Sequence, residues 1–371
     1  MRKRVVISAV NIRKGGTLTV LRDCLRYLSG RGDLQVTALV HKRELCGFEG
    51  IEYIEIPWSI DSWGKRLKCE YRTMKGISEQ LQPVDLWLSL HDTTPDVTAR
   101  HQAVYCQTSF PFLKIRARDF RMDKKIPLFA LFTKFAYRKN VHRNDFLIVQ
   151  QYWLRYGLSK MLRVDPERII VAPPRFQNPA IEDTSSRESI PAFLYPASPD
   201  CHKNFELLCE AAERLEKKLG ANAFRVILTI DGTENKYAAW IRKQWGHIPS
   251  IDFRGFLSKD DLYACYGKAA CLVFPSRVET WGLPISEFKT TGKPMLLADL
   301  PYARESAAGA GPVSFFDIDD AEDLAHQMEL VIQRKISNFG RIIPRKPEAP
   351  FAPDWEALFA LLLQDESTST R

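Results

Sequence analysis

Short apolar runs that alternate with longer amphipathic segments constrain the fold of this chain more than any other feature. Five such runs occur in the first half of the sequence: Val5–Val10, Leu34–Val40, Leu86–Leu90, Ala103–Cys106 and Phe146–Val149. Six more follow in the second half: Ala192–Tyr195, Arg225–Ile230, Ile251–Phe253, Cys271–Phe274, Met295–Ala298 and Val313–Phe316. Runs of this kind indicate buried strands of parallel sheets, with the amphipathic segments as helices on the sheet faces.

A segment rich in proline and serine separates the two halves. Three prolines fall within residues 173–179, and a polar run continues to Pro191. The chain has 371 residues, of which 45% are apolar, and this exceeds what one ordinary core requires. We therefore expect two doubly wound α/β domains that face a cleft, with ligands bound at the carboxyl ends of the strands.

The stretch 274–312 places charged residues at one of these strand ends. Glu279 and Glu287 stand eight positions apart, with Pro284 between them. Proline suits the first turn of a helix, so Gly282 should lie at a helix N-terminus, whose free amides attract phosphate. The two carboxylates can accept hydrogen bonds from paired hydroxyls, such as those of a sugar and of a ribose. A nucleotide sugar carries all of these groups.

This motif resembles the signature of GT-B fold, family-4-like retaining glycosyltransferases (glycosyltransferase group 1), and more specifically their mannosyltransferase-like members. Upstream, residues 254–257 resemble the loop before the motif, and downstream residues 292–294 and 303–305 resemble its continuation. The resemblance is specific over about residues 190–330 and weaker before them. It implies the GT-B architecture of two Rossmann-like domains.

The resemblance also implies where the domains begin and end. Residues 1–175 would form an acceptor-side domain, and residues 176–345 a domain that binds the nucleotide sugar. In residues 346–371, the sequence from Pro353 to Phe359 resembles the last helix of the family, which crosses back to the first domain. A frayed tail would follow it.

Several residues are implied to bind the donor. Glu279 would orient the hydroxyls of the transferred sugar and Glu287 those of the ribose, while Lys203 would neutralise the leaving diphosphate. Many relatives carry an arginine shortly before this lysine, where this chain has Ala197 and Ser198, so an arginine from elsewhere, such as Arg277, could substitute. The other expected donor-binding residues are Gly16, Gly255, Trp281, Gly282 and Leu283. For Gly16 the alternative is a simple tight turn, and for Lys203 a solvated surface lysine.

Two polar segments that follow strands of the first domain are candidates for the acceptor side. His91 and Asp92 follow one strand, and Gln107 and Thr108 follow another. Relatives often have a histidine in the second segment, so His91 or Asp92 could orient the acceptor or the reacting sugar. The predicted catalytic residues are thus these two together with Glu279 and Lys203. A structural histidine at a strand end is the competing interpretation of His91.

We expect neither a metal nor another cofactor. Retention of anomeric configuration, which the resemblance implies, suggests that the leaving phosphate oxygen accepts the acceptor proton, so no protein base is required. The sequence does contain an Asp-x-Asp pattern at Asp317 and Asp319. Because Asp320 and further acids follow it, we interpret the pattern as the N-terminus of a helix.

Positive charge is concentrated in residues 111–143. This segment holds ten basic residues and two acids, a difference of +8 that equals the formal net charge of the whole chain. Apolar residues at helical spacing are interleaved with the bases. The pattern is typical of a segment that lies on an anionic membrane surface, as an enzyme with a lipid-linked acceptor would require. A core-packed helix with solvated lysines is the alternative.

These observations predict a retaining glycosyltransferase that transfers a hexose from a nucleoside-diphosphate sugar, with GDP-mannose favoured, to a glycan or lipid-linked acceptor of a cell-surface polysaccharide such as lipopolysaccharide. The alternatives are a GT-B fold sugar-nucleotide epimerase, a phosphorylase and a basic nucleic-acid-binding protein; we expect no nucleic-acid partner. Eight cysteines without a CxxC pair indicate reduced thiols, and no signal peptide is recognisable. We therefore expect a cytoplasmic protein, peripheral on the inner membrane.

Overall fold

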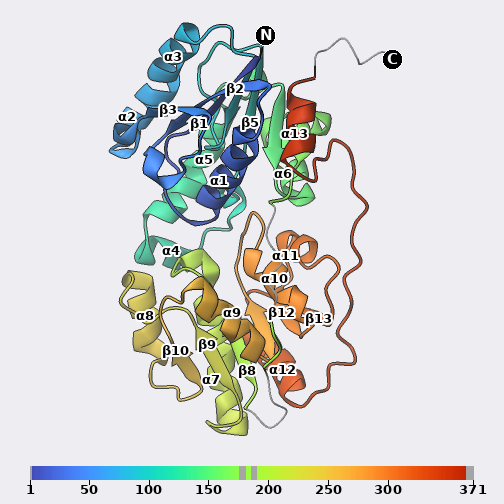
Figure 1. Ribbon diagram of the computed structural model, residues 1–371. Coiled ribbons are helices and arrows are strands. Elements are labelled where there is room, and N and C mark those ends of the chain that lie inside the picture. Colours follow the sequence, from blue (N-terminus) through green and yellow to red (C-terminus); the bar gives the residue numbers. More distant parts are fainter. Residues whose placement is uncertain (1, 175–180, 185–189, 365–371) are drawn as a thin grey trace. The chain divides into compact units, whose positions relative to one another are not determined.

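The expected alternation of strands and helices is present in both halves of the chain (Figure 1). The computed structural model describes residues 2–174, 181–184 and 190–364. It divides into two units, each built around one parallel sheet. Unit 1 comprises residues 1–108, 132–175 and 347–371, and unit 2 comprises residues 109–131 and 176–346.

The sheet of unit 1 has seven parallel strands in the order β3-β2-β1-β4-β5-β6-β7. The strands are β1 (Lys3–Ala9), β2 (Leu34–Val40), β3 (Ile51–Glu55), β4 (Leu86–Ser89), β5 (His101–Tyr105), β6 (Phe146–Val149) and β7 (Ile169–Val171). The α-helices of this unit are α1 (Gly15–Ser29), α2 (Trp63–Lys68), α3 (Met74–Gln80), α6 (Tyr152–Leu162) and α13 (Trp355–Leu362). A further helix, α5 (Lys125–Arg138), begins in unit 2 and ends in unit 1.

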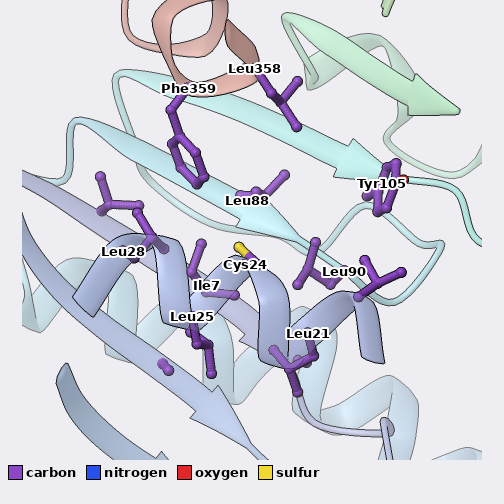
Figure 2. Packing of buried hydrophobic residues seen from close by; sticks show 14 of the residues in the cluster. Ile7, Leu21, Cys24, Leu25, Leu28, Leu88, Leu90, Tyr105, Leu358 and Phe359 are labelled. Carbon is purple, nitrogen blue, oxygen red and sulfur yellow. The ribbon is translucent and has the colours of Figure 1, made fainter. Parts of the chain in front are cut away.

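Strand β1 contributes side chains to two hydrophobic core layers. Its side chains alternate, so Val5 and Ile7 join one hydrophobic cluster while Val6 joins another on the opposite face. Figure 2 shows the first cluster, in which side chains of α1 and α13 meet side chains of the strands. Tyr27 of α1 stacks on Phe359 of α13, with ring centroids 5.6 Å apart. The C-terminal helix is therefore part of the core of unit 1.

The sheet of unit 2 has six parallel strands in the order β10-β9-β8-β11-β12-β13. The strands are β8 (Ala192–Tyr195), β9 (Arg225–Leu228), β10 (Ile251–Phe253), β11 (Cys271–Phe274), β12 (Met295–Ala298) and β13 (Val313–Phe316). The α-helices of this unit are α4 (Ala117–Met122), α7 (Phe205–Leu219), α8 (Lys236–Trp245), α9 (Lys259–Lys268), α10 (Leu283–Phe288), α11 (Pro301–Ser306) and α12 (Ala321–Ile332). Both sheets are doubly wound, so the predicted fold class is confirmed.

Every apolar run singled out in the sequence forms a strand, but the sequence did not reveal β3 and β7. Strand β3 has the sequence IEYIE, lies at an edge of its sheet and is mostly outside the core, so its apolar signal is interrupted by charge. Strand β7 spans three residues at the other edge. Short and half-exposed edge strands carry too few apolar residues to stand out.

One segment differs from the expected domain boundaries. Residues 109–131, which we call the strap, lie in the first half of the sequence but belong to unit 2. Their polar side chains bond to residues of the second half, as in the ion pair between Asp119 and Arg277. These contacts join residues that are 158 positions apart in the sequence, so strand periodicity could not predict them.

Candidate active site

The order of strands in unit 2 reverses between β8 and β11. From β8 the chain continues outward to β9 and β10, and from β11 it continues in the other direction to β12 and β13. The loops that leave the carboxyl ends of these two neighbours therefore diverge, which is where doubly wound sheets bind ligands. Lys203 lies after β8, and Glu279 lies after β11. The fold thus brings these two predicted site residues to the same place.

Lys203 and Glu279 form an ion pair. The Lys203 Nζ donates to Glu279 Oε1 at 2.5 Å, and each side chain is 14% exposed. A lysine ammonium carries three N–H donors, and a carboxylate has two acceptor oxygens, so one contact leaves both groups with further bonding capacity. The pair is accessible enough to meet a ligand and buried enough to be held in place.

Two buried tyrosines support the loops that carry this pair. The hydroxyl of Tyr195 donates to the carbonyl of Lys203 at 2.6 Å and lies 3.0 Å from the Ser276 hydroxyl. The hydroxyl of Tyr302 donates to the carbonyl of Ser276 at 2.7 Å. Burial raises the pKa of both tyrosines well above the ordinary range, so both hydroxyls keep their protons and remain donors. Tyr195 of β8 and Tyr302 of α11 thus hold both loops in place.

The loop after Glu279 ends at Gly282, the N-cap of helix α10. Gly282 has a φ of 93°, in the left-handed region that glycine tolerates best. Its carbonyl accepts from the N–H of Ile285 at 3.0 Å. The indole of Trp281 donates to the Ser286 hydroxyl at 2.9 Å, and Leu283 is the first residue of the helix. Because α10 has six residues, any attraction of an anion here rests on local N–H groups more than on a long helix dipole.

Glu287 lies in α10 and is held by helix α9. The hydroxyl of Tyr266 donates to Glu287 Oε2 at 3.0 Å, and Tyr263 also bonds to this carboxylate. The two tyrosine rings are stacked, with centroids 6.0 Å apart. Burial raises the pKa of Glu287, although both tyrosines oppose this by hydrogen bonding to the ionised form. The carboxylate is therefore fixed in orientation before any ligand binds.

Gly255 follows β10 and has a backbone reason to be glycine. Its φ is 74°, and a Cβ placed there would lie 2.9 Å from Asp231 Oδ2. The adjacent Arg254 is bound to Asp252, with Nε 2.8 Å from Oδ2. The backbone therefore approaches the neighbouring loop too closely for a side chain, whether or not a donor binds here.

Arg277 does not present its charge to a ligand. Its side chain is 2% exposed and its Nη2 lies 2.6 Å from Asp119 Oδ1, a carboxylate that is itself 3% exposed. The suggestion that Arg277 substitutes for the arginine of related sequences is therefore wrong in its simplest form. Its positive charge is neutralised inside unit 2, and Lys203 is left as the cation beside Glu279.

In unit 1 the predicted acceptor-side residues also come together, at the carboxyl ends of β4 and β5. The carboxylate of Asp92 accepts from the N–H groups of Gln107 and Thr108, at 2.5 and 3.0 Å, and from the hydroxyl of Tyr137 at 3.0 Å. The Gln107 amide donates to the carbonyl of Leu90 at 2.8 Å. Burial raises the pKa of Asp92 to about 6 in spite of these bonds. Asp92, Gln107 and Thr108 thus belong to one internal network.

His91 is buried among other partners. Its side chain is 0% exposed, and its Nε2 and Nδ1 lie 3.0 Å from the Ser8 hydroxyl and 3.2 Å from the Thr93 hydroxyl. Burial and the nearby Arg66 hold its pKa well below the ordinary value, so the ring is neutral. This position favours a structural role over contact with an acceptor. Gly16, by contrast, is exposed in the first turn of α1.

The Asp-x-Asp pattern lies at the start of α12. Asp320 is the N-cap and accepts from the N–H groups of Glu322 and Asp323, while Asp317 Oδ1 accepts from the N–H of Asp319 at 2.9 Å. These bonds confirm that the acids form a helix N-terminus. In the part of the chain that the structure describes, no group of three or more His, Cys, Asp or Glu side chains could hold a metal ion.

The sequence did not identify Asp119 as a partner of the site. The only signal was that it is one of two acids among ten bases in residues 111–143. An isolated acid in a basic segment is a candidate for a buried ion pair, because a buried carboxylate requires a cation or several donors. Its partner could not be named without the fold.

Comparisons with known proteins identify relatives of this chain. Residues 178–340 match the family described as Glycosyl transferases group 1. The O-antigen chain mannosyltransferase RfbU of Salmonella typhimurium is 24% identical over 178 residues, which are 47% of this chain and 48% of that protein. The chain thus spans about half the length of this curated relative.

Solved structures resemble the chain over most of its length. A glycosyltransferase from Rickettsia africae has a TM-score of 0.65 and 14% identity, over 92% of this chain and 91% of that one. The lipopolysaccharide outer core galactosyltransferase WaaB has a TM-score of 0.63 and 11% identity, over 90% of this chain and 91% of that one. HepE of Anabaena, solved with UDP-glucose, has a TM-score of 0.59 and 12% identity, over 97% of this chain and 95% of that one. At these identities the likeness establishes the fold.

Proposed function

We propose that this chain, whose residues 178–340 match the Glycosyl transferases group 1 family and whose fold is GT-B, is a retaining glycosyltransferase that transfers a hexose from a nucleoside-diphosphate sugar. The observation that carries the proposal is the Lys203–Glu279 ion pair at the switch point of the second sheet. It lies within the matched residues 178–340. A cation and a carboxylate at this position suit a diphosphate and the hydroxyls of a sugar.

The chemistry assigned to these residues is positioning and charge stabilisation. The bond from the anomeric carbon to the diphosphate oxygen breaks, the acceptor hydroxyl attacks from the same face, and its proton passes to the departing phosphate oxygen. Lys203 stabilises the negative charge that develops on the diphosphate, a contribution of roughly 3–4 kcal/mol for one preorganised contact. Glu279 orients the sugar, and Glu287, held by Tyr266, orients the ribose. The proposal requires no protein base.

For the donor we favour GDP-mannose, and for the acceptor a glycan or lipid-linked intermediate of a surface polysaccharide. The support is the match of residues 178–340 to the Glycosyl transferases group 1 family, together with the relative RfbU, whose name describes an O-antigen chain mannosyltransferase. HepE, solved with UDP-glucose, makes a UDP-linked donor the competing choice.

Calorimetric titration of the purified protein with GDP and with UDP, in the presence of EDTA, tests the proposal. Each nucleotide offers the base, ribose and diphosphate contacts without the unknown acceptor. Selective binding of GDP, with weaker but still measurable binding in Lys203→Ala, is the expected result. Binding of UDP alone would reassign the donor. If neither nucleotide binds, with or without added Mg²⁺, the transferase proposal fails.

We also propose that the protein acts at an anionic membrane surface. Helix α5 exposes four apolar side chains at positions i, i+3, i+4 and i+7, namely Leu128, Leu131, Phe132 and Phe135, which are 44%, 44%, 62% and 57% exposed. This is one continuous stripe along the helix, and lysines at positions 124, 125 and 134 accompany it. Such a helix suits the interface between lipid tails and anionic headgroups. In the described residues, no helix has the length and apolar character needed to cross a membrane.

Flotation with liposomes tests the membrane proposal. Vesicles with anionic phosphatidylglycerol should retain the wild type, whereas a Phe132→Ser, Phe135→Ser double variant should be retained at least fivefold less. Ile343→Ser serves as the control, since it removes an exposed apolar side chain, 86% exposed, outside the stripe. Equal retention of the wild type and the double variant would contradict the assignment to α5.

A further inference from the structure

The strap, residues 109–131, contacts the candidate active site from a distant part of the sequence. Three charged side chains of the strap, all within residues 116–119, make these contacts. Arg116 donates to Asn204 Oδ1 at 3.0 Å, Arg118 bonds to the carboxylate of Glu206, and Asp119 pairs with Arg277 at 2.6 Å. Asn204 and Glu206 follow Lys203, and Arg277 precedes Glu279 by two positions. The strap therefore holds both loops that carry the ion pair.

The guanidinium of Arg277 is the junction of these contacts. Besides Asp119, its Nη2 reaches the carbonyl of Cys201 at 3.2 Å, and its Nη1 reaches the carbonyl of Lys114 at 3.2 Å. The backbone N–H of Arg277 donates to the carbonyl of His202 at 2.8 Å. One buried side chain thus ties the strap to the loop after β8 and to the loop after β11.

Aromatic packing reinforces the same junction. Phe110 of the strap lies edge-on to the His202 ring, with centroids 5.1 Å apart. His202 is buried, and burial holds its pKa well below the ordinary value, so the ring is neutral and acts as an apolar contact. The residue before Lys203 is therefore fixed by the strap on its side chain and by Arg277 on its backbone.

We propose that Asp119 is a positioning residue for the donor site. By fixing the Arg277 guanidinium, it sets the spacing of the two loops at which Lys203 meets Glu279 and can reach the diphosphate of a bound nucleotide. This inference rests on the proposed function, since it assigns Asp119 to the binding of that same diphosphate. A buried ion pair suits this purpose because each hydrogen bond has a fixed direction, which an apolar contact lacks.

The test is calorimetric binding of the nucleotide, GDP or UDP, that binds the wild type. Asp119→Asn, which removes the charge and keeps the size, should weaken binding at least tenfold. Introduced into a Lys203→Ala background, the same change should weaken binding less than twofold, because the group that it positions is absent. A general loss of folded structure would lower binding, or the number of sites, equally in both backgrounds.

Two further variants complete the design. Arg277→Lys keeps a cation for Asp119 but cannot reach both carbonyls, so it should weaken binding by an intermediate factor. It replaces Asp119→Asn in the test if that variant is too unstable. Glu322→Gln removes an exposed carboxylate of unit 2 that pairs with Arg214, and it should bind as the wild type does. Unchanged binding in Asp119→Asn and Arg277→Lys, or equal losses in both backgrounds, would overturn the inference. Failure of the wild type to bind either nucleotide would instead overturn the proposed function, and the inference with it.

Discussion

The two sheets present polar side chains at equivalent places, but these side chains are used differently. In each sheet the strand order reverses between the first strand and its central neighbour, at β1 and β4 in unit 1 and at β8 and β11 in unit 2. In unit 2 this place holds Lys203 and Glu279, each 14% exposed. In unit 1 it holds His91, which is 0% exposed and bonded through both ring nitrogens.

The difference shows that position in a doubly wound sheet does not by itself make a binding site. A side chain at a strand end can bind a ligand only if it reaches solvent and keeps bonding capacity. The carboxylate of Asp92 accepts three donors from its own unit, whereas Glu279 is bonded to one lysine. The unit 1 network stabilises the fold, and the unit 2 pair can exchange partners. The following predictions test this contrast.

The largest effect is expected at the unit 2 pair. Lys203→Ala should reduce the rate of sugar transfer by roughly 10²–10³-fold, because one preorganised contact to the developing charge is lost. Glu279→Gln should likewise lower turnover more than nucleotide affinity. Initial rates with the donor chosen by calorimetry measure both. The control is Lys218→Ala, which removes an exposed lysine that pairs with Glu329 in the same unit. Variants of Lys203 and Glu279 with normal rates would remove this pair from the active site.

A smaller effect, on stability, is expected at the unit 1 network. Asp92→Ala should lower the free energy of unfolding by about 1–3 kcal/mol, since two N–H groups and the Tyr137 hydroxyl lose their acceptor. Urea denaturation measures this loss. Asp61→Ala, which breaks an exposed ion pair with Lys65, should cost less than about 0.5 kcal/mol. If Asp92→Ala instead abolished transfer at unchanged stability, Asp92 would be functional, and the contrast between the units would fail.

The next effect concerns Glu287, the carboxylate that is proposed to bind the ribose. Glu287→Gln should weaken nucleotide binding by about fivefold, or about 1 kcal/mol, because the amide keeps one acceptor oxygen but loses the charge. Tyr266→Phe, which removes the donor that orients this carboxylate, should have a similar or smaller effect. Calorimetry with the nucleotide product checks both variants. Unchanged affinity in both would place the ribose elsewhere.

The last expected effect is a pH dependence of stability that arises from Asp92. Burial raises its pKa from the ordinary value of 3.8 to about 6 in the folded protein. The folded state therefore binds the proton more tightly than the unfolded state does, and this stabilisation is lost as the pH rises from about 4 to 6. In Asp92→Asn that loss should be absent, so urea midpoints of the wild type should fall relative to the variant between pH 4.5 and 6.5. Parallel midpoints would show that Asp92 ionises normally.

Much of the fold could be predicted because burial is recorded locally in the sequence. A strand that is covered on both faces must be apolar throughout, so runs such as Leu34–Val40 and Cys271–Phe274 can be recognised as strands from the sequence. Edge strands lack this requirement, which is why β3 and β7 gave no signal. The donor motif was equally local, because the residues from Glu279 to Glu287 form one loop and one helix turn.

The sequence by itself therefore determined the α/β class, and it singled out Glu279, Glu287 and Lys203, of which the structure pairs Lys203 with Glu279. It did not determine which polar residues remain accessible. His91 and Lys203 both follow apolar strands, and only the packing of neighbouring elements buries one and leaves the other in reach of a ligand. Nor could it join Asp119 to Arg277, because that contact spans 158 positions. Burial and long-range pairing depend on what other parts of the chain cover, and the tertiary structure decides both.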